Sequence, residues 1–234
     1  MENLFKEAFI YKESNCTLIS DKQDGIEIAK TAIKHHHELL EQYIAHHPRF
    51  GWSLKPVAVP QEPTICTLMA QAAEKAKVGP MAAVAGVLAD LAVKEMTTAG
   101  AEVAVVENGG EISAMSNTAV DVALAAGDEA LSKKLGFRLT EFPLGVATSS
   151  GRFSHALSFG DAEAATVFCK SAGLADAAAT AVGNAVKGEN VNYAIEKGVD
   201  VAKSIVGVEG LFILYKGCVG MWGKVPQIIR INSH

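Results

Sequence analysis

The sequence predicts an α+β fold in which a largely antiparallel sheet packs against pairs of helices. Three observations support this prediction. Short alternating or apolar segments follow one another in hairpin order, with turn residues between them. Long segments with apolar residues at helical spacing lie between groups of strands. The chain has 234 residues, enough for a sizeable core, and we expect a single domain over residues 1–234.

The first part of the chain is predicted to form a hairpin and three helices. The expected elements are strands 4–13 and 16–20 with a turn near Ser14 and Asn15, followed by helices 23–47, 63–77 and 80–99. Pro48 ends the first helix, and Pro80 suits the first turn of the third. The proline-rich segment 48–63 is expected to be a long connection, either an edge strand or a lid.

The rest of the chain is predicted to be mostly short strands around one pair of helices. The expected strands are 102–108, 119–125, 136–142, 144–150, 155–159 and 165–169, then helices 173–188 and 191–206, a hairpin over 211–222 and a last strand over 227–231.

Composition excludes several classes of protein. The net charge is −5 and no basic stripe is present, so nucleic acid is not an expected partner. No apolar run reaches the eighteen or so residues of a membrane helix, and residues 1–14 lack the apolar core of a secretory signal. The four cysteines are far apart and form no CxxC pair. We therefore expect a cytoplasmic protein with reduced thiols and no membrane partner, while homo-oligomerisation is left open.

One predicted helix combines small apolar residues with three polar ones spaced four apart. Within residues 173–188, Asp176, Thr180 and Asn184 share a face, because positions i, i+4 and i+8 drift slowly around a helix. A carboxylate and a hydroxyl one turn apart can share a hard cation such as Mg²⁺, with water and substrate phosphate as its other ligands. The alternative is a solvated polar stripe, with Asp176 favouring the helix N-terminus.

The segment ENGGEI, residues 107–112, places a glycine pair at the end of an apolar strand. Gly109 and Gly110 allow the backbone to approach a ligand closely, and Glu107 and Glu111 flank the turn as acceptors. The alternative is a plain hairpin turn, because Asn-Gly is a strong type I′ signal.

The segment ATSSGRFSHALSF, residues 147–159, places hydroxyl groups and a glycine after another strand. Thr148, Ser149 and Ser150 with exposed backbone N–H groups are candidates for an anion-binding nest, and an ordinary turn is the alternative. His155 begins the next expected strand and is either a catalyst or a hydrogen-bonded core residue.

The helix expected over residues 80–99 opens with small residues, which either admit a phosphate at its N-terminus or allow close packing. Asp90 lies in the apolar stretch AGVLADLAV, so we expect its carboxylate to face inward. The alternative is a surface ion pair with Lys94, four residues further on.

Three adjacent histidines, His35–His37, lie in a predicted helix with charged neighbours. Adjacent helical positions point in different directions, so the three side chains cannot chelate one metal ion together. We expect them to lie on a solvated face and to be dispensable for ligand binding.

Taken in order, the segments VGPMAAVAG…AD, ENGGEI, ATSSG, HALSFG and ATVFCKSAGLADAAATA resemble the motifs of the ApbE superfamily of flavin transferases. Over almost the whole chain, the sequence is more closely similar to a cytoplasmic ApbE-like family of archaea and anaerobic bacteria. The resemblance implies a layered, T-fold-related structure. It also implies binding of FAD or another flavin nucleotide with Mg²⁺, and transfer of the FMN moiety to a threonine or serine of an acceptor protein.

The resemblance also implies roles for individual residues. Asp176 and Thr180 fall on the metal-binding aspartate and threonine of ApbE enzymes. The cofactor-binding candidates are Asn108, Gly109, Gly110 and Glu111 at the glycine turn, and Thr148, Ser149, Ser150 and Gly151 at the hydroxyl-rich turn. His155 and Asp90 are the candidates for deprotonating the accepting hydroxyl.

Two features depart from the ApbE pattern. Ala85 stands where these enzymes usually carry a lysine, and residues 50–60 stand where they carry a serine-and-asparagine motif. Two other functions are therefore considered. One is a noncatalytic module that binds a nucleotide or a partner protein. The other is an enzyme or accessory factor in sulfide-dependent homocysteine formation, to which the closer family has been linked.

Overall fold

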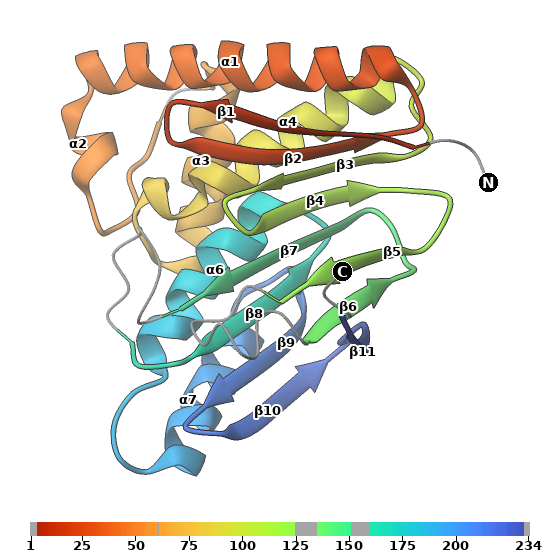
Figure 1. Ribbon diagram of the computed structural model, residues 1–234. Coiled ribbons are helices and arrows are strands. Elements are labelled where there is room, and N and C mark those ends of the chain that lie inside the picture. Colours follow the sequence, from red (N-terminus) through yellow and green to blue (C-terminus); the bar gives the residue numbers. More distant parts are fainter. Residues whose placement is uncertain (1–3, 60, 125–134, 151–159, 232–234) are drawn as a thin grey trace.

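The computed structural model describes residues 4–59, 61–124, 135–150 and 160–231 (Figure 1). Its largest element is an eight-stranded sheet in which every neighbouring pair is antiparallel. In sheet order the strands are β1 (Phe5–Tyr11), β2 (Ser14–Ser20), β3 (Ala104–Asn108), β4 (Glu111–Met115), β7 (Leu144–Ser149), β8 (Ala164–Cys169), β9 (Val208–Tyr215) and β10 (Cys218–Gly223). The prediction of a largely antiparallel sheet is confirmed.

A second, three-stranded antiparallel sheet packs on one face of the large sheet. Its strands are, in order, β11 (Gln227–Arg230), β6 (Leu135–Leu139) and β5 (Val120–Ala123). Phe137 on β6 meets Phe168 and Phe212 of the large sheet edge-on, with ring centroids 5.0 and 5.6 Å apart. These rings lie in one apolar cluster between the two sheets.

The helices cover the other face of the large sheet (Figure 1). They are α1 (Gln23–His46), α2 (Pro48–Trp52), α3 (Thr64–Ala76), the 3-10 helix η1 (Pro80–Ala83), α4 (Val84–Thr98), α6 (Ala172–Ala185) and α7 (Val191–Ser204). Two apolar clusters join them to the sheet, one around α1 and α4 and one around α3, α6 and α7. The central strands are therefore buried on both faces, which explains their nearly continuous apolar sequences.

Helices α4 and α6 cross closely because a glycine of each faces the other. A Cβ atom on Gly86 would lie 2.3 Å from the carbonyl oxygen of Ala172, and one on Gly173 would lie 2.4 Å from Cγ2 of Val87. The N-terminal turns of both helices take part in this contact. The crossing thus brings together two helix N-termini from distant parts of the chain.

Several local predictions need correction. The β1–β2 turn lies at Lys12 and Glu13, two residues earlier than expected, and Lys12 takes the positive φ of 52° that the turn requires. The segment after α1 begins with the short helix α2, which the sequence interpretation missed, and no residue described within 48–63 lies in a strand. Strand β4 was also missed, because its small polar residues hide the alternation. The strand expected over 155–159 lies outside the described residues.

Among the described residues, no single helix has the length and apolar character to span a membrane. One pair of helices, α3 with residues 80–98, meets those criteria together, but with a bend of 101°.

Candidate functional site

The glycine turn lies at the end of β3, where the strand reaches the N-terminal turn of α4. Gly109 and Gly110 form a two-residue hairpin loop with φ of 69° and 115°, values that favour glycine. Asn108 is the last residue of β3 and is 3% exposed. Its Nδ2 donates to the carbonyl oxygen of Ala85 at 3.3 Å, which fixes the turn against α4.

Asp176 reaches the same place from α6. Its Oδ2 accepts a hydrogen bond from the backbone N–H of Gly86 at 3.0 Å, so the carboxylate lies at the positive end of α4. Burial raises the pKa of Asp176 well above its ordinary value, and the Glu111 carboxylate acts in the same direction, against the N–H groups of Gly86 and Ala85. Asp176 therefore carries its charge at an energetic cost in the absence of a further partner.

Glu111 opens β4 directly opposite Asn108. Strand alternation places its side chain on the helix-covered face of the sheet, because Ile112 belongs to the cluster on the other face. Burial raises the pKa of Glu111 to about 7, and repulsion from Glu107 contributes to that shift. The turn therefore brings together two carboxyl groups, Glu111 and Asp176, that repel each other when both are ionised.

Asp90 faces inward from α4, as predicted, and meets the N-terminus of α6. Its two oxygens accept four hydrogen bonds, from Ser113 Oγ and Ser171 Oγ, both at 2.7 Å, and from the backbone N–H groups of Ala172 and Gly173 at 2.9 and 3.0 Å. Because both of its oxygens already accept hydrogen bonds, the Asp90 carboxylate serves to hold the N-terminus of α6 in position. Its assignment as a base stays a prediction that this geometry does not favour.

The hydroxyl-rich segment is divided between strand and loop. Thr148 and Ser149 belong to β7, paired with β8, so a turn or nest at these two positions is wrong. Thr148 faces the small sheet and its hydroxyl lies 2.9 Å from that of Thr166, whereas Ser149 faces the helices. Ser150 follows the strand, and its buried Oγ has no hydrogen-bond partner among the described residues. The predicted residues Gly151 and His155 lie outside the described residues.

Thr180 lies one turn beyond Asp176 on α6 and is partly buried. The described residues contain no group of three or more His, Cys, Asp or Glu side chains that would hold a metal ion. A cation bound by Asp176 would therefore need oxygen ligands from hydroxyl groups, backbone carbonyls, water or a phosphorylated ligand. That donor set suits Mg²⁺.

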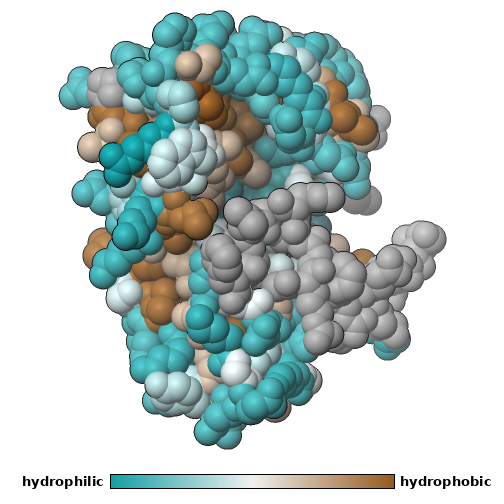
Figure 2. All heavy atoms as spheres, turned by 90° about the vertical axis from the view of Figure 1, so that its left-hand side faces the viewer, coloured by the Kyte–Doolittle hydropathy of each residue, from teal (hydrophilic) through white to brown (hydrophobic). Residues whose placement is uncertain are grey.

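A cavity of about 450 Å³ opens beside the glycine turn, on the side of the molecule that Figure 2 faces. Ala85, Asn108 and Gly109 line it, so it is continuous with the candidate site. Hydrophobic residues gather on this side of the molecule below the hydrophilic surface at its top (Figure 2). Trp52 and Leu54, in and after α2, are exposed.

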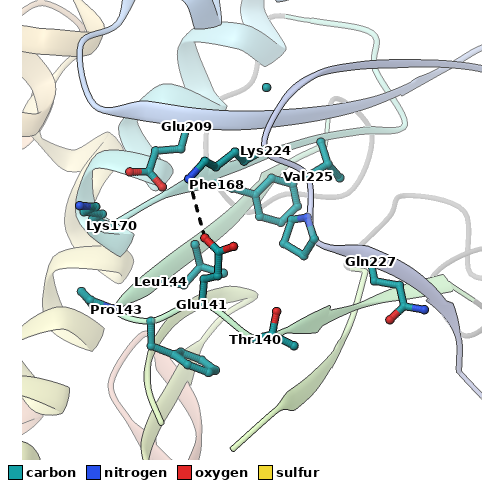
Figure 3. Close-up of a pocket in the computed structure, with 13 residues that line it drawn as sticks. Thr140, Glu141, Pro143, Leu144, Phe168, Lys170, Glu209, Lys224, Val225 and Gln227 are labelled. Atoms are coloured by element: carbon teal, nitrogen blue, oxygen red, sulfur yellow. Dashed lines mark ion pairs between the residues drawn. The ribbon is translucent and has the colours of Figure 1, made fainter. Parts of the chain in front are cut away.

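A second cavity, of about 620 Å³, lies at the opposite end of the strands of the large sheet, where β7 and β9 begin (Figure 3). Two lysines and two glutamates are among its lining residues, and Lys224 Nζ lies 3.8 Å from Glu141 Oε2 on a well-exposed surface. None of the predicted site residues that the structure describes lines this cavity. We therefore place the candidate site at the glycine turn.

The expectation that all three histidines face solvent is wrong for His37, and His36 is half-buried. His37 is 7% exposed and lines the cavity beside the glycine turn, whereas His35 is exposed. Helical geometry had correctly separated the three side chains, but the hairpin β1–β2 covers the face that His37 occupies. Its Nε2 lies 3.3 Å from Oε2 of Glu13 in that hairpin.

Sequence reasoning missed the residues that complete the two helix N-termini. Ser113 and Ser171 bind Asp90, and the N–H of Gly86 binds Asp176. Ser171 carried a usable signal, since serine is a preferred N-cap residue and its side chain accepts from Leu174 N–H. Backbone donors from another helix leave no sequence signal.

The chain matches relatives along most of its length. A family model described as "AbpE bacteria" matches residues 9–208. The UPF0280 protein of Methanococcus vannielii is 39% identical over 235 residues, covering 98% of this chain and 95% of the relative. The UPF0280 protein of Methanosarcina acetivorans is 40% identical over 229 residues, covering 96% of this chain and 89% of the relative.

Two solved structures share the fold. The flavinyl transferase ApbE of Pseudomonas stutzeri superposes with a TM-score of 0.59 at 14% identity, covering 94% of each chain. The ApbE protein of Thermotoga maritima superposes with a TM-score of 0.55 at 13% identity, covering 98% of this chain and 97% of that one. These superpositions show a common architecture, whereas the family model and the UPF0280 relatives show the family. The chain belongs to the ApbE-like family described as "AbpE bacteria", as its motifs predicted.

Proposed function

We propose that this chain binds FAD through its phosphates, together with Mg²⁺, at the junction of the glycine turn, α4 and α6, and that it transfers the FMN moiety to a protein hydroxyl. One observation carries the proposal. Asp176 lies partly buried at the N-terminus of α4, beside Asn108 and Glu111, with backbone N–H groups of α4 as its donors and with a raised pKa. A divalent cation would offset both the energetic cost of burying the Asp176 charge and its repulsion from Glu111.

The residues present fit a metal–phosphate ligand. Asp176 and Thr180 would hold Mg²⁺, and the ligand phosphate would complete its coordination. The unpartnered, buried hydroxyl of Ser150 offers a hydrogen bond at the end of β7. Backbone N–H groups at the turn and at the start of α4 would face the phosphates. When bound, Mg²⁺ neutralises charge that develops on the diphosphate during transfer.

The transfer would form a bond between the acceptor oxygen and the FMN phosphorus, and break the bond from that phosphorus to the oxygen of the departing AMP. The acceptor hydroxyl must lose its proton. We assign that proton to His155, because both oxygens of Asp90 already accept hydrogen bonds. Asp90 would instead hold the first turn of α6, and through it Asp176, in position.

One observation favours binding without transfer as a second candidate function. Ala85 stands in place of the lysine expected at this helix start, and its carbonyl oxygen holds Asn108. The described lining of the adjacent cavity includes no lysine or arginine. A module of this kind would bind the nucleotide and present it to a partner protein.

The deciding experiment mixes purified protein with FAD and Mg²⁺ and measures binding, AMP release and flavin attached to protein. AMP release together with attached flavin supports transfer, and Mg²⁺-dependent binding alone supports the second function. Absence of binding in the presence of Mg²⁺ would overturn both. Asp176→Asn is the matched variant, because it keeps the side-chain shape and removes the charge.

A further inference from the structure

We infer that two copies of this chain associate through β10, the last strand of the large sheet, by antiparallel strand pairing about a twofold axis. The large sheet ends at β10, and none of the described strands pairs with its outer edge (Figure 1). Strands β7, β8 and β9 separate β10 from the glycine turn between β3 and β4. The inference therefore concerns a different surface from the proposed ligand site and does not depend on the proposed function.

The two edges of the large sheet differ in their protection. Strand β1 carries the charged residues Lys6 and Glu7, and α1 runs alongside it, with Lys30 of α1 donating to Glu7 at 2.6 Å (Figure 1). Strand β10 has the sequence CVGMWG, with no charged residue and no proline, and its pairing with β9 has no bulge. Sheets usually protect an open edge by such charges, by proline, by a bulge or by a covering element. The edge of β10 is thus suited to pairing with another strand.

The hairpin between β9 and β10 determines which backbone groups of β10 are free. Its two-residue loop has positive φ at both positions, 48° and 74°, as in a type I′ turn, so Tyr215 and Cys218 form the hydrogen-bonded pair that closes it. Hydrogen-bonded and non-hydrogen-bonded pairs alternate along an antiparallel ladder. The N–H and C=O groups of Val219 and Met221 therefore point away from β9, toward the open edge.

The free groups of β10 are complementary to those of a second β10. With Gly220 on the twofold axis, Val219 of each chain lies opposite the partner's Met221, and their outward N–H and C=O groups bond to each other. Val219 and Met221 are 53% and 57% exposed and share the face of the small sheet, so they also form an apolar pair across the axis. A shift by two residues would place Val219 opposite Gly223, which has no side chain to pack.

The charges at the ends of β10 are compatible with this pairing. The same register places Lys216 opposite the partner's Lys224, but each ammonium group has a carboxylate in its own chain. Lys216 Nζ lies 3.2 Å from Glu189 Oε2, and Lys224 Nζ lies 3.8 Å from Glu141 Oε2. The repulsion between the two lysines is therefore offset within each chain.

A shallow hollow of about 640 Å³ beside β10 also suits an uncharged partner. Its described lining residues include no charged side chain and are Met221, Trp222, Gly223, Val225, Pro226 and Ile228. An uncharged strand beside an uncharged hollow gives a charged peptide segment no favourable contact. A second β10, which brings Val219 next to Met221 at this hollow, matches both features.

The test measures the oligomeric state of the full chain by sedimentation velocity over about two decades of protein concentration. We expect a dimer. Met221→Lys should weaken dimerisation at least about tenfold, because it places an ammonium group in an apolar contact at both symmetric positions. The matched control is Ile10→Lys, since Ile10 is 72% exposed on β1, the opposite edge strand, and its replacement should leave the dimer unchanged.

Val219→Pro is an independent variant, because it removes an outward N–H group without removing a hydrogen bond to β9. It should also weaken dimerisation at least about tenfold, with circular dichroism confirming that the variant is folded. In the unmodified protein, protection of the Val219 and Met221 amides from hydrogen exchange should rise with concentration, a result that needs no variant. A monomer at every concentration would overturn the inference. A dimer that both folded variants leave intact, or that Ile10→Lys weakens as much as Met221→Lys, would also overturn it.

Discussion

Asp90 and Asp176 form a reciprocal pair at the crossing of α4 and α6. Each aspartate projects from one helix to the N-terminus of the other, and each accepts backbone N–H groups there. They differ in saturation. Asp90 accepts four hydrogen bonds, two of them from serine hydroxyls. Asp176 has the backbone N–H groups of Gly86 and Ala85 as its donors and is repelled by Glu111.

The difference separates a structural capping residue from a candidate ligand-binding residue in the same local geometry. A carboxylate with all its acceptor sites used stabilises the fold and has little capacity to bind another molecule. A carboxylate with unused acceptor sites and a raised pKa destabilises the empty protein and gains most from a cation. Four predictions test this division, from the largest expected effect to the smallest.

Removing Asp90, whose acceptor sites are all used, should have the largest effect on stability. Asp90→Ala leaves two serine hydroxyls and two backbone N–H groups without their acceptor, so the free energy of unfolding should fall by about 3 to 4 kcal/mol. Urea unfolding measures it. Asp121→Ala is the control, since its ion pair with Arg138 is exposed and should contribute less than about 1 kcal/mol. Equal losses in the two variants would break the comparison.

Glu111→Gln should stabilise the empty protein in a pH-dependent way. The pKa of Glu111 is raised from 4.5 to about 7, so below 4.5 the folded and unfolded states are both protonated and no penalty exists. As the pH rises through this window, the unfolded chain ionises first and the unmodified protein loses stability. The gain from glutamine should grow to at most about 3 kcal/mol above pH 7. An equal gain in stability from Glu111→Gln at pH 4.5 and above pH 7 would contradict this prediction.

The two glycines of the crossing should respond differently to alanine. In Gly86→Ala the new Cβ meets a backbone carbonyl at 2.3 Å, which cannot move without shifting α6, so we expect a loss of about 2 kcal/mol. In Gly173→Ala the Cβ meets Cγ2 of the buried Val87 at 2.4 Å, a side-chain atom rather than a backbone carbonyl, and the higher helix propensity of alanine offsets part of the strain. That loss should be smaller than the loss for Gly86→Ala in thermal or urea unfolding. A larger loss for Gly173→Ala would show that the α6 side of the crossing is the less adaptable.

Removing the charge of Asp176, which has unused acceptor sites, should affect ligand binding more than folding. Asp176→Asn should weaken Mg²⁺-dependent FAD binding at least about tenfold, or about 1.4 kcal/mol, through loss of one charge-assisted contact. The melting temperature without ligand should stay nearly unchanged or rise, because burial and Glu111 already oppose that charge. Calorimetry with and without Mg²⁺ measures it, with the exposed Asp200→Asn as control. Unchanged affinity with a large drop in melting temperature would make Asp176 a structural cap like Asp90.

Much of the fold could be predicted from the sequence because its signals are local. The apolar spacing of α1 gave helix 23–47 against the observed Gln23–His46, and the hairpin over 211–222 is present as β9 and β10. The motif set also gave the family correctly. Errors occurred where local signals are weak, as at β4, or where a proline starts one helix while it ends another, as at Pro48.

The site was predicted in part: features set by neighbouring residues were predicted, and features set by tertiary contacts were not. Sequence spacing placed Asp176 and Thr180 one turn apart on one helix, and composition placed glycines in a turn and Asp90 in an apolar helix, because these are properties of neighbouring residues. Only the tertiary structure decided that Asp90 is saturated while Asp176 is not, and that His37 lines a cavity. Burial and hydrogen-bond supply depend on backbone groups brought from distant segments, and such groups are the same in every residue and leave no mark in the sequence.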